Sequence, residues 1–326
     1  MNDTPDEATA VRCFSAREIA TDPLVIALLK RCAFPEVPRE GVQQLNCAVS
    51  GGADSTALLV LAVATGAHVT ALHVDHGLRE GSNNESQLVA ELARSLGAEF
   101  VSLMAVVQPG GDLEARARAA RLAALPEGAL FGHTSDDQAE TLLIRLMRGT
   151  GPAGLAGMRS EFHPLLGLRR SETESLCVRF GLQPFSDPSN NDPRFVRNRV
   201  RHEALPLLSQ ISDRDVTPLL CRLAELCAEQ ADLISALARS EDPCDAKVLA
   251  SLPSALAAEV IRLWWSRSTG IVYPPDAAAI ARILSVARGD SVSCEVGSGW
   301  RVMRTAGRLS LQHAAASETA TVAADD

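Results

Sequence analysis

The feature that most constrains this chain is a glycine-rich stretch, SGGADS, at residues 50–55. The apolar run before it, 45–49, indicates a buried strand, and the Ala-, Leu- and Val-rich run after it is long enough for a helix. Two glycines allow a sharp turn and the close approach of a ligand. A helix that begins behind such a turn directs its N–H groups and its positive dipole end toward it. The stretch therefore predicts an anion site, with an ordinary strand-to-helix turn as the alternative.

Two common nucleotide-binding motifs do not occur here. No Lys follows the glycines, as the pattern GxxxxGK requires, and the pattern GxGxxG is also absent. The stretch instead resembles the PP-loop of ATP pyrophosphatases, whose pattern SGGxDS follows the first strand. That resemblance implies cleavage of ATP between its α- and β-phosphates and transfer of the adenylyl group to a substrate oxygen. The residues expected to bind ATP are Ser50, Gly51, Gly52, Ala53, Asp54 and Ser55.

The segments that follow alternate between strand-like and helical patterns. Strands are predicted at 68–74, 99–107 and 129–133, and helices at 83–96 and 112–124. This order predicts an α/β fold with an open, mostly parallel sheet and helices on both faces. Ligands bind such sheets outside the carboxyl ends of the strands. The polar residues that follow each strand are therefore expected to meet at one edge, beside the SGGADS stretch.

Acidic side chains crowd the beginning of the helix predicted after the fourth strand. Asp136, Asp137 and Glu140 lie in its first turns, and His133 precedes them. One acid there is ordinary helix capping and compensation of the dipole, but three exceed that need. Paired carboxylates beside a phosphate site indicate Mg²⁺ coordination or a general base.

Composition limits the classes of function that fit the chain. The net charge of −9 argues against general affinity for nucleic acid, although 194–201 holds four Arg and no acid, a pattern that also suits a solvated helix face. Eight Cys occur without a CxxC pair, which favours reduced thiols over a zinc or iron–sulfur site. No apolar run is long enough to span a bilayer, and the acidic N-terminus does not resemble a signal peptide, so we expect a cytoplasmic protein.

A change of character along the chain predicts two domains. We expect a catalytic α/β domain at 21–211 and a smaller, mainly helical accessory domain at 212–313 that ends in strand-like pieces. Residues 1–20 are expected to be poorly ordered apart from a short helix at 15–20, and 314–326 to form a disordered tail.

Six motifs in colinear order, within residues 42–210, resemble those of the tRNA(Ile)-lysidine synthetase family. They are SGGADS, HVDHGLR, GHTSDDQAET, RGTGPAGLAGM, HPLLGLRRSE and DPSNNDPRFVRNRVR, which begin at residues 50, 73, 132, 148, 163 and 187. The first is shared by the whole PP-loop superfamily, and the later ones are specific to this family. Two positions depart from the family's pattern: His163, where Arg is common, and Leu122, where an aromatic residue is common.

The resemblance implies that the chain attaches lysine to the wobble cytidine of the isoleucine tRNA with anticodon CAU. ATP would adenylate the C2 oxygen of the cytosine, and the ε-amine of free L-lysine would displace AMP. The products would be lysidine, AMP and pyrophosphate. ATP and Mg²⁺ are therefore the expected cofactors, and free L-lysine and this tRNA the expected partners. No membrane is involved, and a homodimer is compatible with the pattern.

The resemblance also implies roles for individual residues. Asp54 and Asp137 are candidate metal ligands, and Asp137 is also a candidate base for the lysine amine. His133 is a candidate partner for a phosphate or a developing charge. Glu140, expected to be an uncompensated carboxylate, is the candidate receptor of lysine. Arginines expected to reach the nucleotide, contact tRNA phosphate or close over the site are Arg118, Arg121, Arg197, Arg199 and Arg201.

Two other functions stay open at this point. One is a different PP-loop adenylating enzyme that acts on tRNA or on a small molecule. A tRNA thiolase of that kind is expected to carry CxxC pairs, which the chain lacks. The other is a nucleotide-binding protein without catalysis, which leaves the three carboxylates of 136–140 unexplained.

Overall fold

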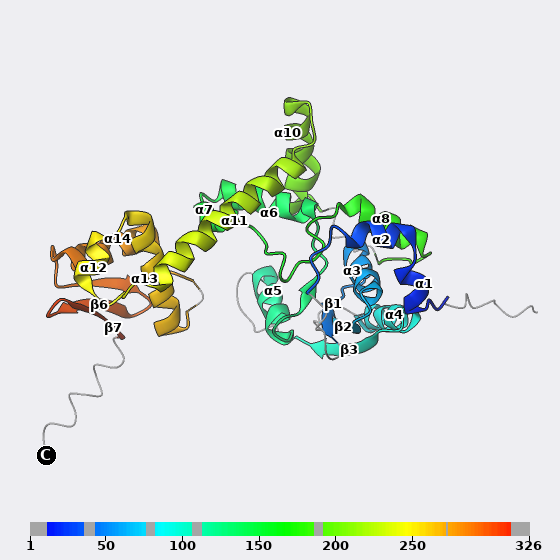
Figure 1. The fold of residues 1–326 in the computed structure, drawn as a ribbon, viewed down its shortest axis with the longest axis horizontal. Coiled ribbons are helices and arrows are strands. Elements are labelled where there is room, and N and C mark those ends of the chain that lie inside the picture. Colours follow the sequence, from blue (N-terminus) through cyan, green and yellow to red (C-terminus); the bar gives the residue numbers. More distant parts are fainter. Residues whose placement is uncertain are drawn as a thin grey trace, which may run out of the picture. The chain divides into compact units, whose positions relative to one another are not determined.

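The computed structural model describes residues 12–35, 43–75, 82–105, 113–185, 192–271 and 273–313. The chain forms two compact units, 1–225 and 226–326 (Figure 1). The division falls within helix α11 (Thr217–Arg239). The domain limits expected from the sequence stay predictions. The expected tail at 314–326, most of the expected N-terminal segment, and parts of the HVDHGLR and DPSNNDP motifs lie outside the described residues.

The first unit is built on a four-stranded sheet whose described pairings are all parallel. Its strands are β1 (Gln44–Ala48), β2 (His68–Asp75), β3 (Glu99–Met104) and β4 (Leu130–Phe131), in the spatial order β3-β2-β1-β4. In β1, Cys47 pairs with Ala71 on one side and with Leu130 on the other. The predicted parallel sheet is confirmed, and β1 leads directly into the SGGADS stretch.

The helices between the strands cover both faces of this sheet. The chain steps from β1 to β2 to β3 in one direction, so right-handed crossovers place α3 (Ala53–Ala64) and α4 (Ser82–Ser95) on one face. It then returns past β1 to β4, which places α5 (Leu113–Ala124) on the opposite face (Figure 1). The arrangement predicted for an α/β fold is therefore present.

Helix α3 is the centre of the main hydrophobic core. Its residues 55–64 are all buried, because three further helices pack over it. These are α1 (Ala16–Ala20), which corresponds to the short helix expected near residue 15, α2 (Pro23–Leu29) and α8 (Arg170–Arg179). Burial on this scale fixes the first turn of α3, and with it the SGGADS stretch, relative to the sheet.

A second, smaller apolar cluster holds the arginine-rich segment against α6 (Ser135–Met147), which is followed by α7 (Pro152–Leu155). The arginine-rich segment is continuous helix: α9 (Val196–Arg199), the π-helical stretch η2 (Val200–Ala204) and α10 (Leu205–Ser212). The buried residues of the cluster are Ala139, Leu143, Val200, Leu205 and Val216. This packing sets arginines of 194–201 beside the acids of α6.

The second unit has its own core, formed between helices and a small antiparallel sheet. Its elements after α11 are α12 (Ala246–Ser251), α13 (Ser254–Thr269), α14 (Ala277–Arg288), β5 (Ser293–Gly297), β6 (Trp300–Thr305) and β7 (Arg308–His313). Ile261, Ile283 and Val302 are buried between them. The strands pair in the order β5-β6-β7, which confirms the strand-like pieces expected at 293–311. No helix in the part of the chain that the structure describes is long and apolar enough to cross a membrane.

Candidate active site

The SGGADS stretch forms a tight loop between β1 and α3. Gly51 has a φ of +86°, which L side chains rarely adopt, and its carbonyl accepts a hydrogen bond from the Phe185 N–H at 2.8 Å. The Ser55 hydroxyl accepts from the Ser50 N–H at 3.2 Å and donates to the Gly52 carbonyl at 2.9 Å. Among the described side chains none caps the N-terminus of α3. The loop therefore presents the start of that helix to a ligand, as the sequence predicts for an anion site.

Gly132 brings the fourth strand against this loop, and the sequence analysis did not single it out. A Cβ at this position would lie 2.5 Å from the carbonyl oxygen of Asp54 and 2.9 Å from the Cα of Ser55. The chain after β4 therefore touches the first turn of α3, backbone against backbone. This contact sets the beginning of α6 beside the SGGADS loop.

Asp137 has two distinct sets of partners at the beginning of α6. Its Oδ2 accepts from the Thr134 N–H at 2.8 Å and from the Thr134 hydroxyl at 3.1 Å, which is a capping arrangement. Its Oδ1 accepts from the guanidinium groups of Arg170 at 2.9 Å and Arg197 at 2.8 Å. Capping therefore accounts for one oxygen of this carboxylate, and the other oxygen faces the arginines.

Glu140 is fully buried and surrounded by guanidinium groups. Arg201 Nε lies 2.6 Å from its Oε1 and Arg197 Nε 2.7 Å from its Oε2, while Arg170 Nη1 lies 3.4 Å from Oε1. The expectation of an uncompensated carboxylate is therefore wrong. A buried carboxylate is costly unless it is paired, and this chain pairs Glu140 with arginines that lie far from it in the sequence.

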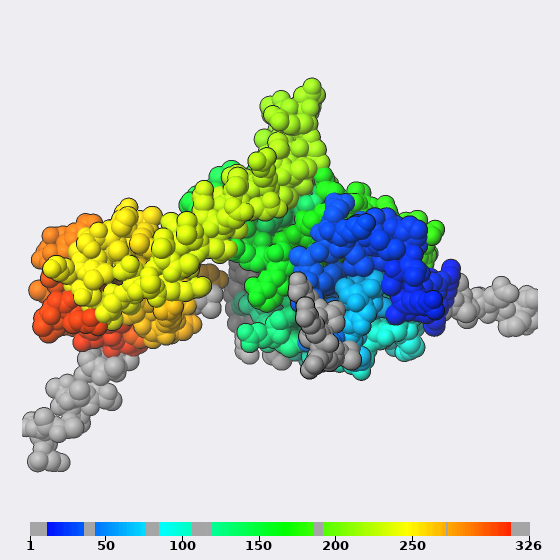
Figure 2. All heavy atoms as spheres, in the orientation of Figure 1, coloured from blue at the N-terminus to red at the C-terminus, as the bar shows by residue number. Residues whose placement is uncertain are grey.

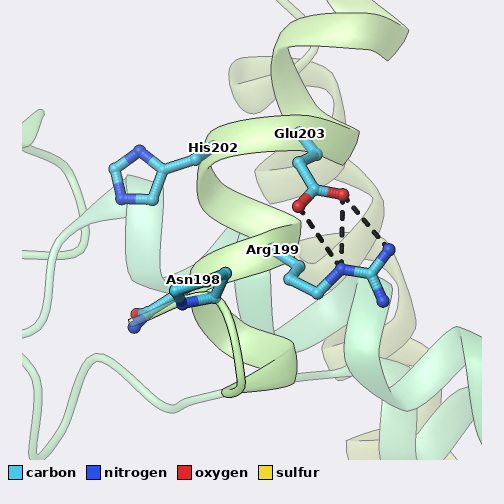
Figure 3. A pocket seen from close by; sticks show the side chains of 5 residues that line it. Asn198, Arg199, His202 and Glu203 are labelled. Atoms are coloured by element: carbon cyan, nitrogen blue, oxygen red, sulfur yellow. Dashed lines mark hydrogen bonds and ion pairs between the residues drawn. The ribbon is translucent and has the colours of Figure 1, made fainter. Parts of the chain in front are cut away.

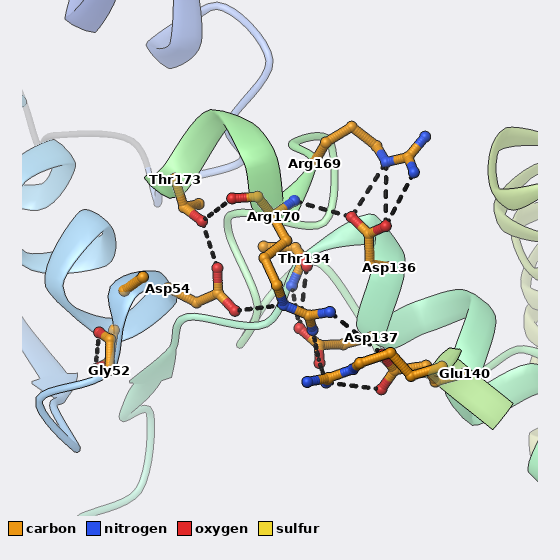
Figure 4. Close-up of polar contacts among 12 residues, drawn as sticks. Gly52, Asp54, Thr134, Asp136, Asp137, Glu140, Arg169, Arg170 and Thr173 are labelled. Carbon is orange, nitrogen blue, oxygen red and sulfur yellow. Dashed lines mark hydrogen bonds and ion pairs between the residues drawn. The ribbon is translucent and has the colours of Figure 1, made fainter. Parts of the chain in front are cut away.

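Arg170 connects three of the carboxylates, as Figure 4 shows. Besides its contacts with Asp137 and Glu140, its Nε lies 3.3 Å from Asp54 Oδ2, and the Thr173 hydroxyl donates to the other oxygen of Asp54. Arg170 is the first residue of α8. An arginine at a helix N-terminus opposes the dipole, so its place in the HPLLGLRRSE motif was a signal that acidic partners hold it there.

Asp136 belongs to a neighbouring, structural part of the network. Its carboxylate accepts from the Arg169 Nε at 3.1 Å and from the Arg170 N–H at 2.9 Å. Arg169 also pairs with Asp215, which lies two residues before the start of α11. Asp136 therefore ties α6 to the start of α8 and is saturated by those contacts.

Burial and charge separate the pKa values of the two candidate metal ligands. The pKa of Asp54 is raised to about 6, mainly by burial and in part by the neighbouring Asp137 carboxylate, while Thr173 and Arg170 act to lower it. Burial also raises the pKa of Asp137, but the Arg170 and Arg197 guanidiniums outweigh it, so that pKa lies below its usual value. Asp54 therefore titrates nearer neutral pH than its partner, a separation typical of catalytic carboxylate pairs.

The donors around Asp54 and Asp137 suit a magnesium ion that is bound together with a nucleotide. Mg²⁺ is commonly held by one or two carboxylates plus substrate phosphates, and both carboxylates meet beside the loop through one shared guanidinium, that of Arg170. Within the described residues no group of three or more His, Cys, Asp and Glu side chains could hold a metal ion by itself. The remaining oxygens would therefore come from phosphate and water.

His133 forms an aromatic group with His163 and Phe131 at the end of β4. The Nδ1 atoms of the two histidines lie 3.0 Å apart, and their rings meet edge to face at 4.8 Å. One Nδ1 donates and the other accepts, so only one of the two rings carries its proton on the shared Nδ1. His163, the position that departs from the family's pattern, is therefore a direct neighbour of a predicted site residue.

The structure separates the predicted arginines into different places. Arg197 and Arg201, four residues apart on one helix face, join the acidic cluster. Arg199 points elsewhere and pairs with Glu203 at 3.2 Å, in a pocket of about 280 Å³ that Asn198 and His202 also line (Figure 3). Arg121 is exposed on α5, and the side chain of Arg118 lies outside the described residues.

Comparisons with known proteins find matches to both units of the chain. The PP-loop domain model matches residues 28–208, and the TilS substrate binding domain model matches 245–310. A tRNA(Ile)-lysidine synthase of Rhodococcus erythropolis is 39% identical over 74% of this chain and 80% of its own length. Those of Nocardia farcinica and Salinispora tropica are 40% and 36% identical over 83% and 89% of this chain, and 92% and 97% of their own lengths.

Proposed function

The chain belongs to the tRNA(Ile)-lysidine synthase family, and we propose that the cluster of Asp54, Asp137 and Glu140 beside the SGGADS loop is its catalytic centre. The reaction is the ATP-dependent ligation of lysine to C2 of the wobble cytidine of isoleucine tRNA with anticodon CAU. AMP and pyrophosphate are released, and the lysidine formed pairs with A, so that the tRNA reads AUA. We place this reaction in the cytoplasm.

The loop of residues 50–55 binds the phosphates of ATP. The observation that supports this most strongly is the combination of a left-handed Gly51 with an uncapped helix start behind it, among the described residues. Main-chain N–H groups at a helix N-terminus bind phosphate without a lysine. This arrangement accounts for the absence of a Lys after the glycines.

Asp54 and Asp137 are the residues that would hold Mg²⁺ beside the phosphates. In the ligand-free protein the Arg170 guanidinium contacts both carboxylates, so it supplies positive charge at the place where the ion would. Magnesium–ATP binding therefore moves Arg170 away from at least one of the two carboxylates. The ion would supply positive charge that stabilises the pyrophosphate as it leaves.

Lysine binds at Glu140, once ATP has drawn arginines away from this carboxylate. The polyphosphate attracts Arg170, Arg197 and Arg201, which all contact Glu140 in the ligand-free protein. A guanidinium that turns from Glu140 to phosphate leaves a buried carboxylate short of a partner, and the lysine ammonium supplies one. ATP binding thus prepares the lysine site. The lowered pKa of Asp137 makes this carboxylate a weak base, so we assign it to the metal and not to the lysine amine.

The tRNA is bound by both units. Arg121 and Arg199 are exposed on the first unit, and the second unit carries the match to the substrate binding domain. Exposed arginines bind phosphate in preference to bases and so position the tRNA. His133 contacts a phosphate or the charge that develops on it. We also propose that the chain works as a homodimer.

The test is release of pyrophosphate from ATP by the purified chain, with and without lysine and an unmodified isoleucine tRNA transcript that carries the CAU anticodon. We expect release that depends on the tRNA, and labelled lysine that becomes acid-precipitable. Turnover with another substrate alone would identify a different PP-loop enzyme. ATP binding without any release of pyrophosphate would identify a non-catalytic nucleotide-binding protein.

Glu140→Gln separates the proposed lysine site from the rest of the reaction. We expect the apparent lysine affinity to fall at least tenfold while tRNA-dependent release of pyrophosphate continues. Glu172→Gln is the matched control, because Glu172 is also paired with an arginine, Arg31, but lies outside the cluster. An unchanged lysine affinity in Glu140→Gln would remove Glu140 from this role.

A further inference from the structure

Two histidines from separate segments of the first unit share a hydrogen bond beside the candidate active site. The Nδ1 atoms of His133 and His163 lie 3.0 Å apart, and both residues are half-buried. The centroid of the Phe131 ring lies 5.9 Å from that of His133 and 5.4 Å from that of His163, so one side of the bond is apolar. A hydrogen bond in apolar surroundings is electrostatically stronger than one in water.

The backbone holds His163 in place from both sides. The Phe131 N–H donates to the Phe162 carbonyl at 2.8 Å, and the Ala33 N–H donates to the Pro164 carbonyl at 2.9 Å. In Figure 2 the green part of the chain, which includes this segment, lies against the blue N-terminal part. The position of His163 is therefore set by the fold and not by a mobile surface loop.

The neighbours of His133 place it beside both parts of the candidate active site. Gly132, the residue before it, packs against the backbone of Asp54, and Thr134, the residue after it, donates to Asp137. His133 therefore lies between the SGGADS loop and the acidic cluster. His163 stands one step further back and reaches the site through His133.

The shared bond links the positions of the protons on the two rings. In a neutral pair, one ring carries its proton on Nδ1 and donates, while the other accepts at Nδ1 and carries its proton on Nε2. A phosphate oxygen accepts hydrogen bonds, and the Nδ1 of His133 is already engaged by His163. Contact of His133 with phosphate therefore requires a proton on its Nε2, which makes His163 the donor at the shared bond.

We propose that His163 is a positioning residue of the reaction: its Nδ1–H donates to Nδ1 of His133 and keeps the proton of His133 on Nε2, where it donates to a phosphate oxygen of ATP. This inference rests on the proposed contact between His133 and phosphate. It adds that the orientation and tautomer of His133 depend on a second histidine, 30 residues further along the chain.

A metal ion between the two histidines is the other arrangement that facing imidazole nitrogens suggest. Zinc sites in proteins take three or four protein ligands. Within the described residues no group of three or more His, Cys, Asp and Glu side chains could hold a metal ion. The hydrogen bond is therefore the interaction that this pair of rings favours.

Nitrogen-15 NMR of the ligand-free full chain with labelled histidine reads both tautomers without any assay of activity. The signals of the seven histidines are assigned by single substitutions. At about pH 8, where an ordinary imidazole is neutral, we expect the proton of His163 on Nδ1 and that of His133 on Nε2. In His163→Phe, which keeps a ring but has no N–H, the His133 signals should move toward the average of the two tautomers. A proton on Nδ1 of His133 in the wild type, or His133 signals that do not change in His163→Phe, would overturn the proposal.

Two substitutions at position 163 separate the donated proton from the shape of the ring. We expect His163→Phe to lower kcat for tRNA-dependent release of pyrophosphate about tenfold, with the KM for lysine unchanged. His163→Asn should retain most of the activity, because its amide N–H can replace the Nδ1–H. His68→Phe is the matched control: His68 is exposed at the start of β2, at the end of the sheet opposite the loop, and this change should leave kcat unchanged. Circular dichroism should show all variants folded.

A double variant tests whether His163 acts through His133. In the His133→Ala protein, His163→Phe should cause no further loss, because both changes remove one contact. Losses that add, equal losses in His163→Phe and His163→Asn, or a wild-type rate in His163→Phe would each overturn the proposal. A wild type that releases no pyrophosphate would instead overturn the proposed function, and the tautomers seen by NMR would still decide whether His163 positions His133.

Discussion

Asp54 is a buried carboxylate of the cluster whose charge changes near neutral pH. Burial raises its pKa to about 6 in the folded protein, while in the unfolded chain an aspartate titrates near 4. The folded state therefore binds more protons than the unfolded state between about pH 4 and pH 6. The contribution of Asp54 to the free energy of unfolding is therefore fully present below pH 4 and is lost as the pH rises through 6.

Replacing Asp54 by asparagine removes this titration. We expect the free energy of unfolding of Asp54→Asn, minus that of the wild type, to rise between pH 4 and pH 7 by at most ~3 kcal/mol. Urea unfolding of the ligand-free proteins at several pH values measures it. Carboxylates whose pKa is lowered and that do not interact with Asp54, such as Glu172, act in the opposite direction but cancel in the difference. A difference that does not change with pH would contradict the raised pKa of Asp54.

For individual residues, the sequence pattern identified the carboxylates of the site better than the arginines that pair with them. Asp137 and Glu140 stand out because they crowd one helix start, which is a local signal. Arg170 and Arg201 neutralise Glu140 from positions 30 and 61 residues away. Such pairing depends on the fold, which a pattern of neighbours cannot reveal. The arginine at the beginning of α8 was the one local hint, since it opposes the helix dipole.

Strand β4 and helix α3 meet through a contact that tolerates only glycine. Gly132→Ala would push a Cβ into the backbone of Asp54 and Ser55, and overpacking of this kind costs about 1–3 kcal/mol. Because the displaced turn is the proposed phosphate site, we expect lower thermal stability and a loss of ATP affinity of at least tenfold. Equilibrium binding of labelled ATP and a melting curve measure the two effects.

Gly151→Ala is the control for that change. A Cβ at Gly151 meets nothing within 4 Å and its φ is negative, so it should leave both stability and ATP affinity unchanged. If Gly132→Ala binds ATP like the wild type, the contact between β4 and α3 does not position the loop.

The order of the elements was predictable where hydrophobic periodicity decides it. The alternation of strands and helices up to β4 follows from buried runs such as those of β1 and α3. The join between α9 and α10 was not predictable, because the π-helical η2 lies between them and its residues have ordinary helical character. Arg201 lies in that π-helical stretch and contacts Glu140. The structural detail that hydrophobic periodicity did not predict is therefore part of the candidate site.

On the scale of the whole molecule, the two units have separate cores, and the chain's three tryptophans lie in only one of them. Trp264, Trp265 and Trp300 all belong to the second unit, while the proposed ATP site is in the first. Tryptophan fluorescence therefore reports unfolding of the second unit alone. Circular dichroism reports both, because each unit contains helices.

This distribution predicts that magnesium–ATP shifts one unfolding transition and not the other. A ligand at a hundred times its dissociation constant stabilises the state that binds it by about 2.7 kcal/mol. For a unit of this size we expect the circular dichroism transition of the first unit to rise by about 5–10 °C. The fluorescence midpoint should stay unchanged, because the second unit does not bind the nucleotide. Mg²⁺ without ATP is the control and should move neither transition. Equal shifts in both signals would mean that the two cores unfold as one cooperative body, joined through α11.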